Sequence, residues 1–103
     1  MEIKLEELLQ IVSGKPQNVM SGMIGRNVFI RSVTFHYIGK VEKIVGEFVE
    51  LSNAAWIADS GRFSDALKKE DFSEVEPYPN PVWINVSSIV DFTELNVLKC
   101  SQK

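Results

Sequence analysis

Residues 28–51 carry the clearest structural signal in the sequence, and they read VFIRSVTFHYIGKVEKIVGEFVEL. β-branched and aromatic side chains dominate this stretch, and such residues favour extended strands. The pattern predicts one strand over residues 28–38, a break at Gly39 that allows a sharp bend or a close backbone approach, and a second strand over residues 41–45. Gly46-Glu47 favours a tight hairpin turn into a third strand over residues 48–51. We therefore expect three meandering strands within residues 26–54.

The segment before these strands predicts one short helix. Four apolar residues recur at the spacing of a single helical stripe, and acidic residues in the first turns suit the helix dipole. Gly14 and Pro16 end the pattern. We expect an N-terminal helix within residues 1–14 and a loop over 15–25. The stripe consists of Leu5, Leu8, Leu9 and Val12.

Residues 55–81 interrupt the strand pattern and predict a helical insertion followed by a Pro-rich linker. Asp59 or Ser60 is expected to cap the helix, because short polar side chains bond to free amides at a helix start. Three prolines and several acidic residues favour an extended linker over residues 70–81. One helical face would hold Phe63, Ala66 and Leu67.

Residues 82–93 predict two final strands joined by a very tight turn at Ser87-Ser88, where the apolar alternation shifts phase. Residues 94–103 read as a polar tail with a frayed end. The fold class is therefore mainly β (α+β), as one domain over residues 1–103. Five short strands are best accommodated in a strongly bent sheet that closes into a small barrel, because closure leaves few free edges.

At three places the sequence resembles the Sm-like (Hfq-like) family. The resembling segments are Ile38-Gly39-Lys40-Val41, residues 46–54 (GEFVELSNA) and residues 82–90 (VWINVSSIV). The resemblance implies a small Sm/SH3-like barrel with an N-terminal helix and an insertion before the last two strands.

The same resemblance implies a homo-oligomeric ring, because Sm-like subunits pair their fourth strand with the fifth strand of the next subunit. The residues expected at this interface are Ile84, Val86 and Ile89. In the Hfq branch a Lys-His pair in the last turn contacts RNA. Residues 85–87 of this chain are Asn-Val-Ser, so that basic group is missing.

Two other segments resemble short uncharacterised proteins of phages and prophages. They are residues 31–40 (RSVTFHYIGK) and residues 54–63 (AAWIADSGRF). No activity is attached to this resemblance. It implies a viral setting, in which small proteins serve as virion parts, as inhibitors of host factors, or as sponges for nucleotide immune signals.

The composition excludes several classes of protein. The net charge of −3 over 103 residues argues against general nucleic-acid binding, although it leaves room for a local basic site. Cys100 is the only cysteine, so an intrachain disulfide and multi-thiolate metal sites are ruled out, and we expect no metal or cofactor. No apolar run reaches about 18 residues and no signal core is present, so we expect a cytoplasmic protein without membrane contact.

Residues 56–63 form the best candidate ligand site, since an indole, a carboxylate, a hydroxyl and a guanidinium gather there. Aromatic faces stack on bases, and Arg binds phosphate. Packing and capping explain the same residues equally well. His36 is the only histidine and lies in a strand pattern, so we expect no enzyme. The tentative ligand-binding set is Trp56, Asp59, Ser60, Arg62, Phe63, Arg31 and His36.

Three functions fit these observations. The first is a non-enzymatic, oligomeric phage-type protein that sequesters a nucleotide-like or nucleic-acid ligand, as a host-defence antagonist. The second is a virion or other structural assembly protein. The third is an inhibitor that docks on a host protein through its acidic segment, residues 70–76.

Overall fold

The fold is built around a meander of three antiparallel strands. A computed structural model describes residues 19–103, in which β1 spans Asn27–Ser32, β2 spans His36–Val45 and β3 spans Phe48–Asp59. The predicted hairpin at Gly46 joins β2 to β3, with a φ of +57° that glycine adopts without strain. The meander predicted from the strand-rich stretch is therefore present.

The first predicted strand is in fact two strands. The break lies at residues 33–35, where the Ser32 hydroxyl accepts a hydrogen bond from the Phe35 amide (2.9 Å) and donates one to the Phe35 carbonyl (2.6 Å). Gly39 does not break the chain, because it lies inside β2. A Cβ added there would stand 2.9 Å from Leu51 Cβ, so Gly39 serves the close backbone approach instead.

Strand β3 is longer than predicted and carries two strands along one edge. Strand β4 (Glu74–Pro77) pairs with its second half, and β5 (Val82–Asn85) pairs with its first half. The predicted boundary at residue 55 is wrong, because Ala55 and Ile57 are buried in strand positions beneath helix α2 (Phe63–Lys69). The described part of the chain therefore forms six strands rather than five, and part of the expected linker is strand β4.

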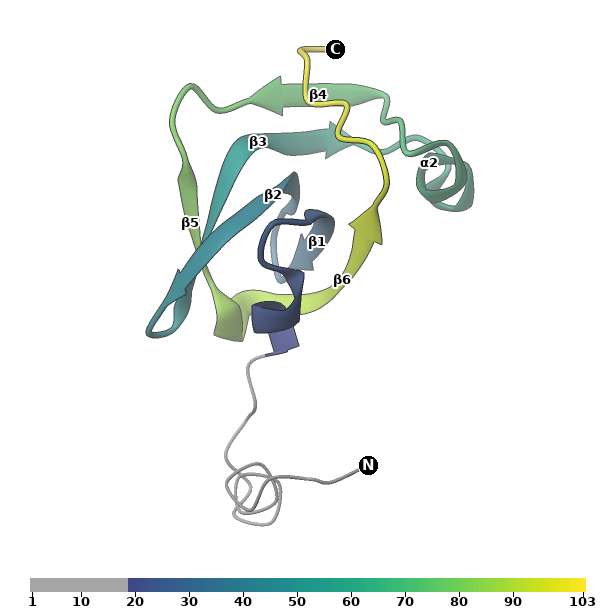
Figure 1. Cartoon of the computed structure of the whole chain (residues 1–103). Helices are drawn as coiled ribbons and strands as arrows, with labels where there is room; N and C mark the ends of the chain where they lie inside the picture. Colours follow the sequence, from purple (N-terminus) through teal and green to yellow (C-terminus); the bar gives the residue numbers. More distant parts are fainter. Residues whose placement is uncertain (1–18) are drawn as a thin grey trace.

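The last two strands follow the predicted pattern. A 3-10 turn η2 (Val86–Ser88) leads from β5 into β6 (Ile89–Leu95), and β6 pairs with β1. The strand order is β4-β3-β2-β1-β6, with β5 also on β3, and every pairing is antiparallel. Figure 1 shows the sheet curling round so that β5 and β6 meet at the bottom of the sheet in that view, where η2 connects them. The result is a bent, mainly β fold with one α-helix among the described residues.

Two apolar cores lie on opposite faces of the bent sheet. Side chains alternate across a strand, so the neighbours Ala54 and Ala55 belong to different cores. Helix α2 covers only the outer core, which contains Ala66. The inner core holds Met20, Val28, Ile30, Val41, Val49, Leu51, Ala54 and Ile84. The outer core holds Phe29, Ile38, Ala55, Ile57, Ala66, Phe72, Val75 and Leu95.

The C-terminal segment is part of the fold, which corrects the prediction of a frayed end to the tail at residues 94–103. Leu98 and Cys100 pack against the outer core. Lys103 and Val75 exchange two backbone hydrogen bonds of 2.9 and 3.0 Å. Figure 1 shows this segment, in yellow, running from β6 across to β4. Apolar contacts and backbone hydrogen bonds together attach this polar segment to the fold.

The predicted N-terminal helix within residues 1–14 lies outside the described residues. A short 3-10 helix, η1 (Val19–Met23), occupies part of the loop expected over residues 15–25, and its Met20 is buried in the inner core. Within residues 19–103, no helix combines the length and the apolar character needed to cross a membrane.

Candidate ligand-binding sites

The loop between β3 and α2 shapes the first candidate site. The Asp59 carboxylate accepts a hydrogen bond of 2.8 Å from the Gly61 amide, which folds the loop into a tight turn. Helix α2 then starts after Arg62, which stands at the N-cap without a side-chain cap bond. The predicted capping by Asp59 or Ser60 is therefore wrong. The Asp59 carboxylate bonds to the Gly61 amide in the loop before the helix, and Arg62 is the N-cap residue.

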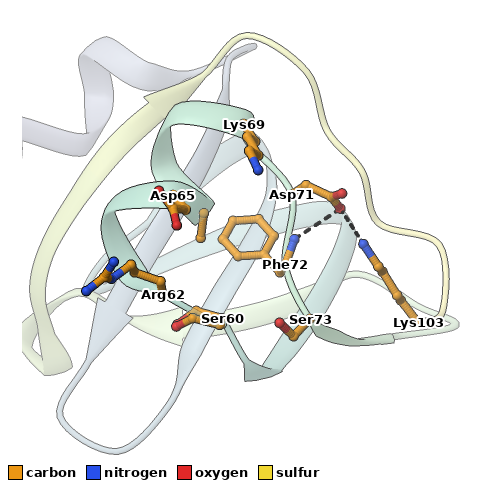
Figure 2. A pocket seen from close by; sticks show the side chains of 10 residues that line it. Ser60, Arg62, Asp65, Lys69, Asp71, Phe72, Ser73 and Lys103 are labelled. Carbon is orange, nitrogen blue, oxygen red and sulfur yellow. Dashed lines mark hydrogen bonds and ion pairs between the residues drawn. The ribbon is translucent and has the colours of Figure 1, made fainter.

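This loop, the helix, the segment after it and the C-terminus enclose a pocket of about 400 Å³. Figure 2 shows it around the buried ring of Phe72, with Lys69 and Asp71 above the ring in that view and Ser60 and Ser73 below it. We call it the insertion pocket. Its lining residues are Ser60, Gly61, Arg62, Asp65, Ala66, Lys69, Asp71, Phe72, Ser73 and Lys103.

The insertion pocket carries three basic side chains and two carboxylates. Asp71 is paired with Lys103 at 2.9 Å, and the hydrogen bond from Lys103 is the main reason that the Asp71 pKa is lowered. Arg62 and Lys69 form no side-chain ion pair with any residue in the range 19–103. Two basic groups therefore remain available, against the single unpaired carboxylate of Asp65.

Gly61 lies close to the opposite wall of the pocket. Its φ is +73°, and an added Cβ would stand 2.6 Å from Ser73 Oγ. The Ser60 and Ser73 hydroxyls both line the pocket. Hydroxyls and basic side chains are the groups that bind phosphate oxygens, so this arrangement suits an anionic ligand.

The acidic segment 70–76 is partly engaged within the chain. The Glu70 carboxylate accepts hydrogen bonds from the backbone amides of Asn96 (3.0 Å) and Val97 (2.7 Å). These two amides lower the Glu70 pKa, the Asn96 amide more than the Val97 amide. Glu70 therefore attaches the C-terminal segment to the end of α2. Of the acids proposed for host-protein docking, only Glu74 and Glu76 lack such contacts among the described residues.

Three residues of the predicted ligand set gather around Phe29, outside the insertion pocket. His36 and Phe63 both contact the Phe29 ring, at centroid distances of 5.5 and 6.0 Å. The Arg31 guanidinium lies 5.3 Å from the Phe63 ring centre and makes a two-point ion pair with Asp91, which lowers the Asp91 pKa. The contact of Phe63 with Phe29 matches the packing alternative raised by the sequence, and Arg31 is bonded to Asp91 within the chain.

Trp56 lies on the inner face, in a second site that sequence reasoning did not identify. Four aromatic side chains line a hollow of about 190 Å³ there: Phe35, Tyr37, Trp56 and Tyr78. We call this the aromatic cage. The Phe35 ring stands at 88° to Trp56 and at 73° to Tyr37, with centroids 5.6 and 6.4 Å apart. Burial, followed by the neighbouring Tyr78, raises the Tyr37 pKa.

The predicted interface residues lie at the β5–β6 connection. Ile84 is buried in the inner core, and Val86 and Ile89 pack against that core. Packing within one subunit therefore accounts for these three side chains, and their role in an interface stays a prediction. More exposed apolar residues lie nearby: Trp83 is 44% exposed and Val90 is 62% exposed.

The predicted ligand set is thus divided among three places. Ser60 and Arg62 line the insertion pocket, and Asp59 shapes its loop. Three further lining residues, Lys69, Ser73 and Lys103, were not predicted from the sequence. Lys69 lies two turns after Arg62 on the predicted helix and Ser73 follows the end of that helix, so both could have been found. The sequence holds no signal for Lys103. It also missed Tyr78, although the run Pro77-Tyr78-Pro79 marks a rigid segment that presents one aromatic ring.

Comparisons with known proteins place the fold. No protein-family model matches the sequence, and no curated protein matches it. Among solved structures, the chain is similar to a heptameric archaeal Sm protein described for its implications for the eukaryotic snRNP core, with a TM-score of 0.53 and 12% identity. That match covers 74% of this chain and 94% of the Sm protein.

A second similar structure is the P. aerophilum SmAP1 heptamer, with a TM-score of 0.55 and 11% identity. The match covers 76% of this chain and 89% of that protein. Identities this low carry information about the fold alone. The bent antiparallel sheet, closed through η2, is an Sm-like fold.

Proposed function

We propose that this protein is a non-enzymatic binding protein that forms a ring of identical subunits and holds a nucleotide-like or nucleic-acid anion in the insertion pocket. The observation that carries the proposal is the unpaired basic pair, Arg62 and Lys69, beside two hydroxyls in a pocket of about 400 Å³. A hollow of this size lies within the range of small-molecule sites.

All the residues that line the pocket come from one chain. Each wall comes from the β3–α2 loop, from α2, from the segment after α2 or from the C-terminus. Arg62 would bind phosphate oxygens in two-point fashion, while Lys69 adds a point charge. Ser60 and Ser73 would donate to the remaining oxygens.

Ring assembly is supported by the two open strand edges. Within residues 19–103, β5 pairs only with β3 and β6 pairs only with β1, so each has a second edge open to a neighbour. The free edge of β4, the strand before β5, is not open in the same way, because Val75 already exchanges backbone hydrogen bonds with Lys103. Pairing β5 of one copy with β6 of the next is a head-to-tail contact, and such contacts form a ring when the rotation between successive copies closes. The similar Sm proteins are heptamers.

Apolar side chains accompany both open edges. Val45, Phe48 and Trp83 surround a shallow hollow beside β5, and Val90 stands at an irregularity in β6 that leaves it without a partner on β1. Exposed apolar residues beside free backbone groups favour association between copies.

The ligand part of the proposal is tested with adenosine monophosphate and isothermal calorimetry. Arg62→Ala should weaken binding about tenfold, because hydrogen bonds to charged groups each contribute about 1.5–3 kcal/mol. The matched control is Lys68→Ala, on the same helix but outside the pocket. An equal effect of both changes, or no effect of Arg62→Ala, would contradict an anion site here. Repeating the titration with a short single-stranded RNA separates a nucleotide from a nucleic-acid ligand.

The ring is tested by native mass spectrometry. Val90→Lys should convert the oligomer to monomers without unfolding, since a charge on an edge strand opposes pairing. Val97→Lys is the control, because Val97 is 53% exposed and lies outside the strands. A wild-type chain that is monomeric at micromolar concentration rules out the ring.

The structural assembly function remains the second candidate, favoured by the apolar hollow beside β5. An assembly protein would lose its oligomer on Val90→Lys and would show no ligand. The phage setting and the role as a host-defence antagonist rest on the sequence resemblance, and they are extensions of this proposal. Docking on a host protein through residues 70–76 has less support, since Glu70 and Asp71 already bond within the chain.

A further inference from the structure

The aromatic cage has walls that stand at steep angles to one another. Phe35 is nearly perpendicular to Trp56, while Tyr37 and Tyr78 are tilted by 31° at 6.4 Å. Phe35 is 46% exposed and Tyr78 is 38% exposed, although aromatic rings usually contribute to a core. Four aromatic side chains are thus held around an open hollow at the rim of the inner core.

The backbone holds these rings in place before any ligand binds. Phe35 is fixed by its two hydrogen bonds with the Ser32 hydroxyl. Tyr78 stands between two prolines, and its amide donates to the Ala54 carbonyl at 2.9 Å. Tyr37 and Trp56 are cross-strand partners on β2 and β3. Preorganised walls lower the entropy lost on binding.

The nearest charged group that the strand register places beside the cage is a carboxylate. None of its lining residues is basic. Glu76 is the register partner of Trp56 on β4, and cross-strand partners present their side chains on the same face. Glu76 forms no ion pair within residues 19–103. The faces of aromatic rings also carry partial negative charge. A cation is therefore favoured here, and a phosphate-bearing ligand is disfavoured.

We propose that the aromatic cage binds a methylated ammonium group, such as the trimethylammonium of choline or of trimethyl-lysine. Such a cation is bulky, weakly hydrated and attracted to aromatic faces. A hollow of about 190 Å³ holds one such group but has little room for more. Glu76, the register partner of Trp56, would supply the neutralising charge. This inference is independent of the insertion pocket and of the ring.

The direct test uses tryptophan fluorescence of the Trp83→Phe variant, in which Trp56 is the only indole. Choline should change the emission with saturable binding. Its neutral isostere, 3,3-dimethyl-1-butanol, should bind about tenfold more weakly, because cation–π attraction is absent. Equal binding of the two would overturn the proposal and leave only an apolar groove. Absence of saturation with choline and with a trimethyl-lysine peptide would overturn it as well.

The two sources of the cation are separated by a peptide pair. Tighter binding of a trimethyl-lysine peptide than of choline points to a modified protein, and the reverse points to choline or its headgroups. Unmodified lysine in the same peptide should bind more weakly than trimethyl-lysine. Saturable quenching of Trp56 by adenosine monophosphate, stronger than by choline, would show a base-stacking site and would contradict the proposal.

Two variants locate the cation in the cage. Tyr78→Ala should lower choline affinity about tenfold, and Glu76→Gln should lower it severalfold without affecting the neutral isostere. Phe63→Ala is the matched aromatic control, because Phe63 is 41% exposed on the other face. If Trp83→Phe fails to fold, the indole signal of Trp56 in the wild-type NMR spectrum provides the same readout, with Trp83 as the internal reference.

Discussion

The insertion pocket lies beside the outer core and the aromatic cage lies beside the inner core, and the two are built in different ways. A loop, a short helix and the chain end surround the insertion pocket, which is lined by charged and hydroxyl groups. Rings on the paired strands β2 and β3, on the connection at residues 33–35 and on the segment after β4 form the cage, which contains no basic group. Strand alternation places Trp56 on one face and Ile57 on the other. The two proposed sites therefore belong to opposite faces of one bent sheet and would take ligands of opposite charge.

The largest effect on the difference between the two sites is expected from a substitution of Phe72, whose ring lines the insertion pocket. Phe72 is 2% exposed and stacks on Phe29 at 5.3 Å. Phe72→Ala should lower the free energy of unfolding by about 3–5 kcal/mol, since it leaves a cavity in the outer core. Urea denaturation measures this loss. If the two faces are independent, choline binding should persist without denaturant, and a parallel loss at the cage would contradict independence.

A smaller change is expected from Gly61→Ala at the rim of the same pocket. Alanine at a positive φ costs about 1–2 kcal/mol, and its methyl group would displace the Ser73 hydroxyl. Stability and affinity for adenosine monophosphate should therefore fall together, with the cage unaffected. Gly22→Ala is the control, because an added Cβ there meets no atom within 4 Å. Unchanged nucleotide affinity would place the ligand away from Ser73.

At the cage, Ser32→Ala removes the hydroxyl that fixes Phe35. We expect a loss of about 1 kcal/mol of stability and a severalfold loss of choline affinity, while nucleotide affinity stays constant. Calorimetry with both ligands on one preparation checks this. Ser64→Ala is the control, since Ser64 is exposed on α2. Loss of nucleotide affinity in Ser32→Ala would show that the two faces are coupled.

The smallest effect concerns pH and the attachment of the C-terminal segment. The amides of Asn96 and Val97 lower the Glu70 pKa below its ordinary value of 4.5. The ionised carboxylate therefore contributes stability above about pH 4.5, and this contribution is lost as the pH falls through the lowered folded-state pKa. Glu70→Gln should reduce Tm slightly at pH 7, and the difference from wild type should disappear at low pH. A difference that grows on acidification would contradict this role.

Much of the fold could be predicted from the sequence, because local patterns determine it. Strand-forming residues, the hairpin at Gly46 and the phase shift near Ser87 predicted the meander and the final strand pair. The break at residues 33–35 was missed, since it depends on hydrogen bonds of Ser32 inside an unbroken run of strand formers. The extension of β3 was missed because Ala55 and Ile57 are buried by α2 and β4, which come later in the chain than the local pattern around these residues.

The sites were less predictable than the fold. Ser60 and Arg62 were predicted because they lie close together in the chain, and both line the insertion pocket. The cage joins residues from a turn, two strands and the segment after β4, so only the register of β2, β3 and β4 brings them together. Trp56 was grouped with residues 59–63, but it lies in the aromatic cage. The predicted third strand ends before Trp56, so the strand alternation that places this side chain on the inner face was missed.

A ¹H–¹⁵N NMR titration of the labelled protein with adenosine monophosphate and then with choline tests the two-site description most directly. We predict that the nucleotide shifts the Gly61 and Ser73 amides and leaves the Trp56 indole unchanged, whereas choline does the reverse. Shifts of the same signals by both ligands would contradict two sites of opposite preference. Absence of shifts at Gly61 and Ser73 with the nucleotide would contradict the proposed function itself.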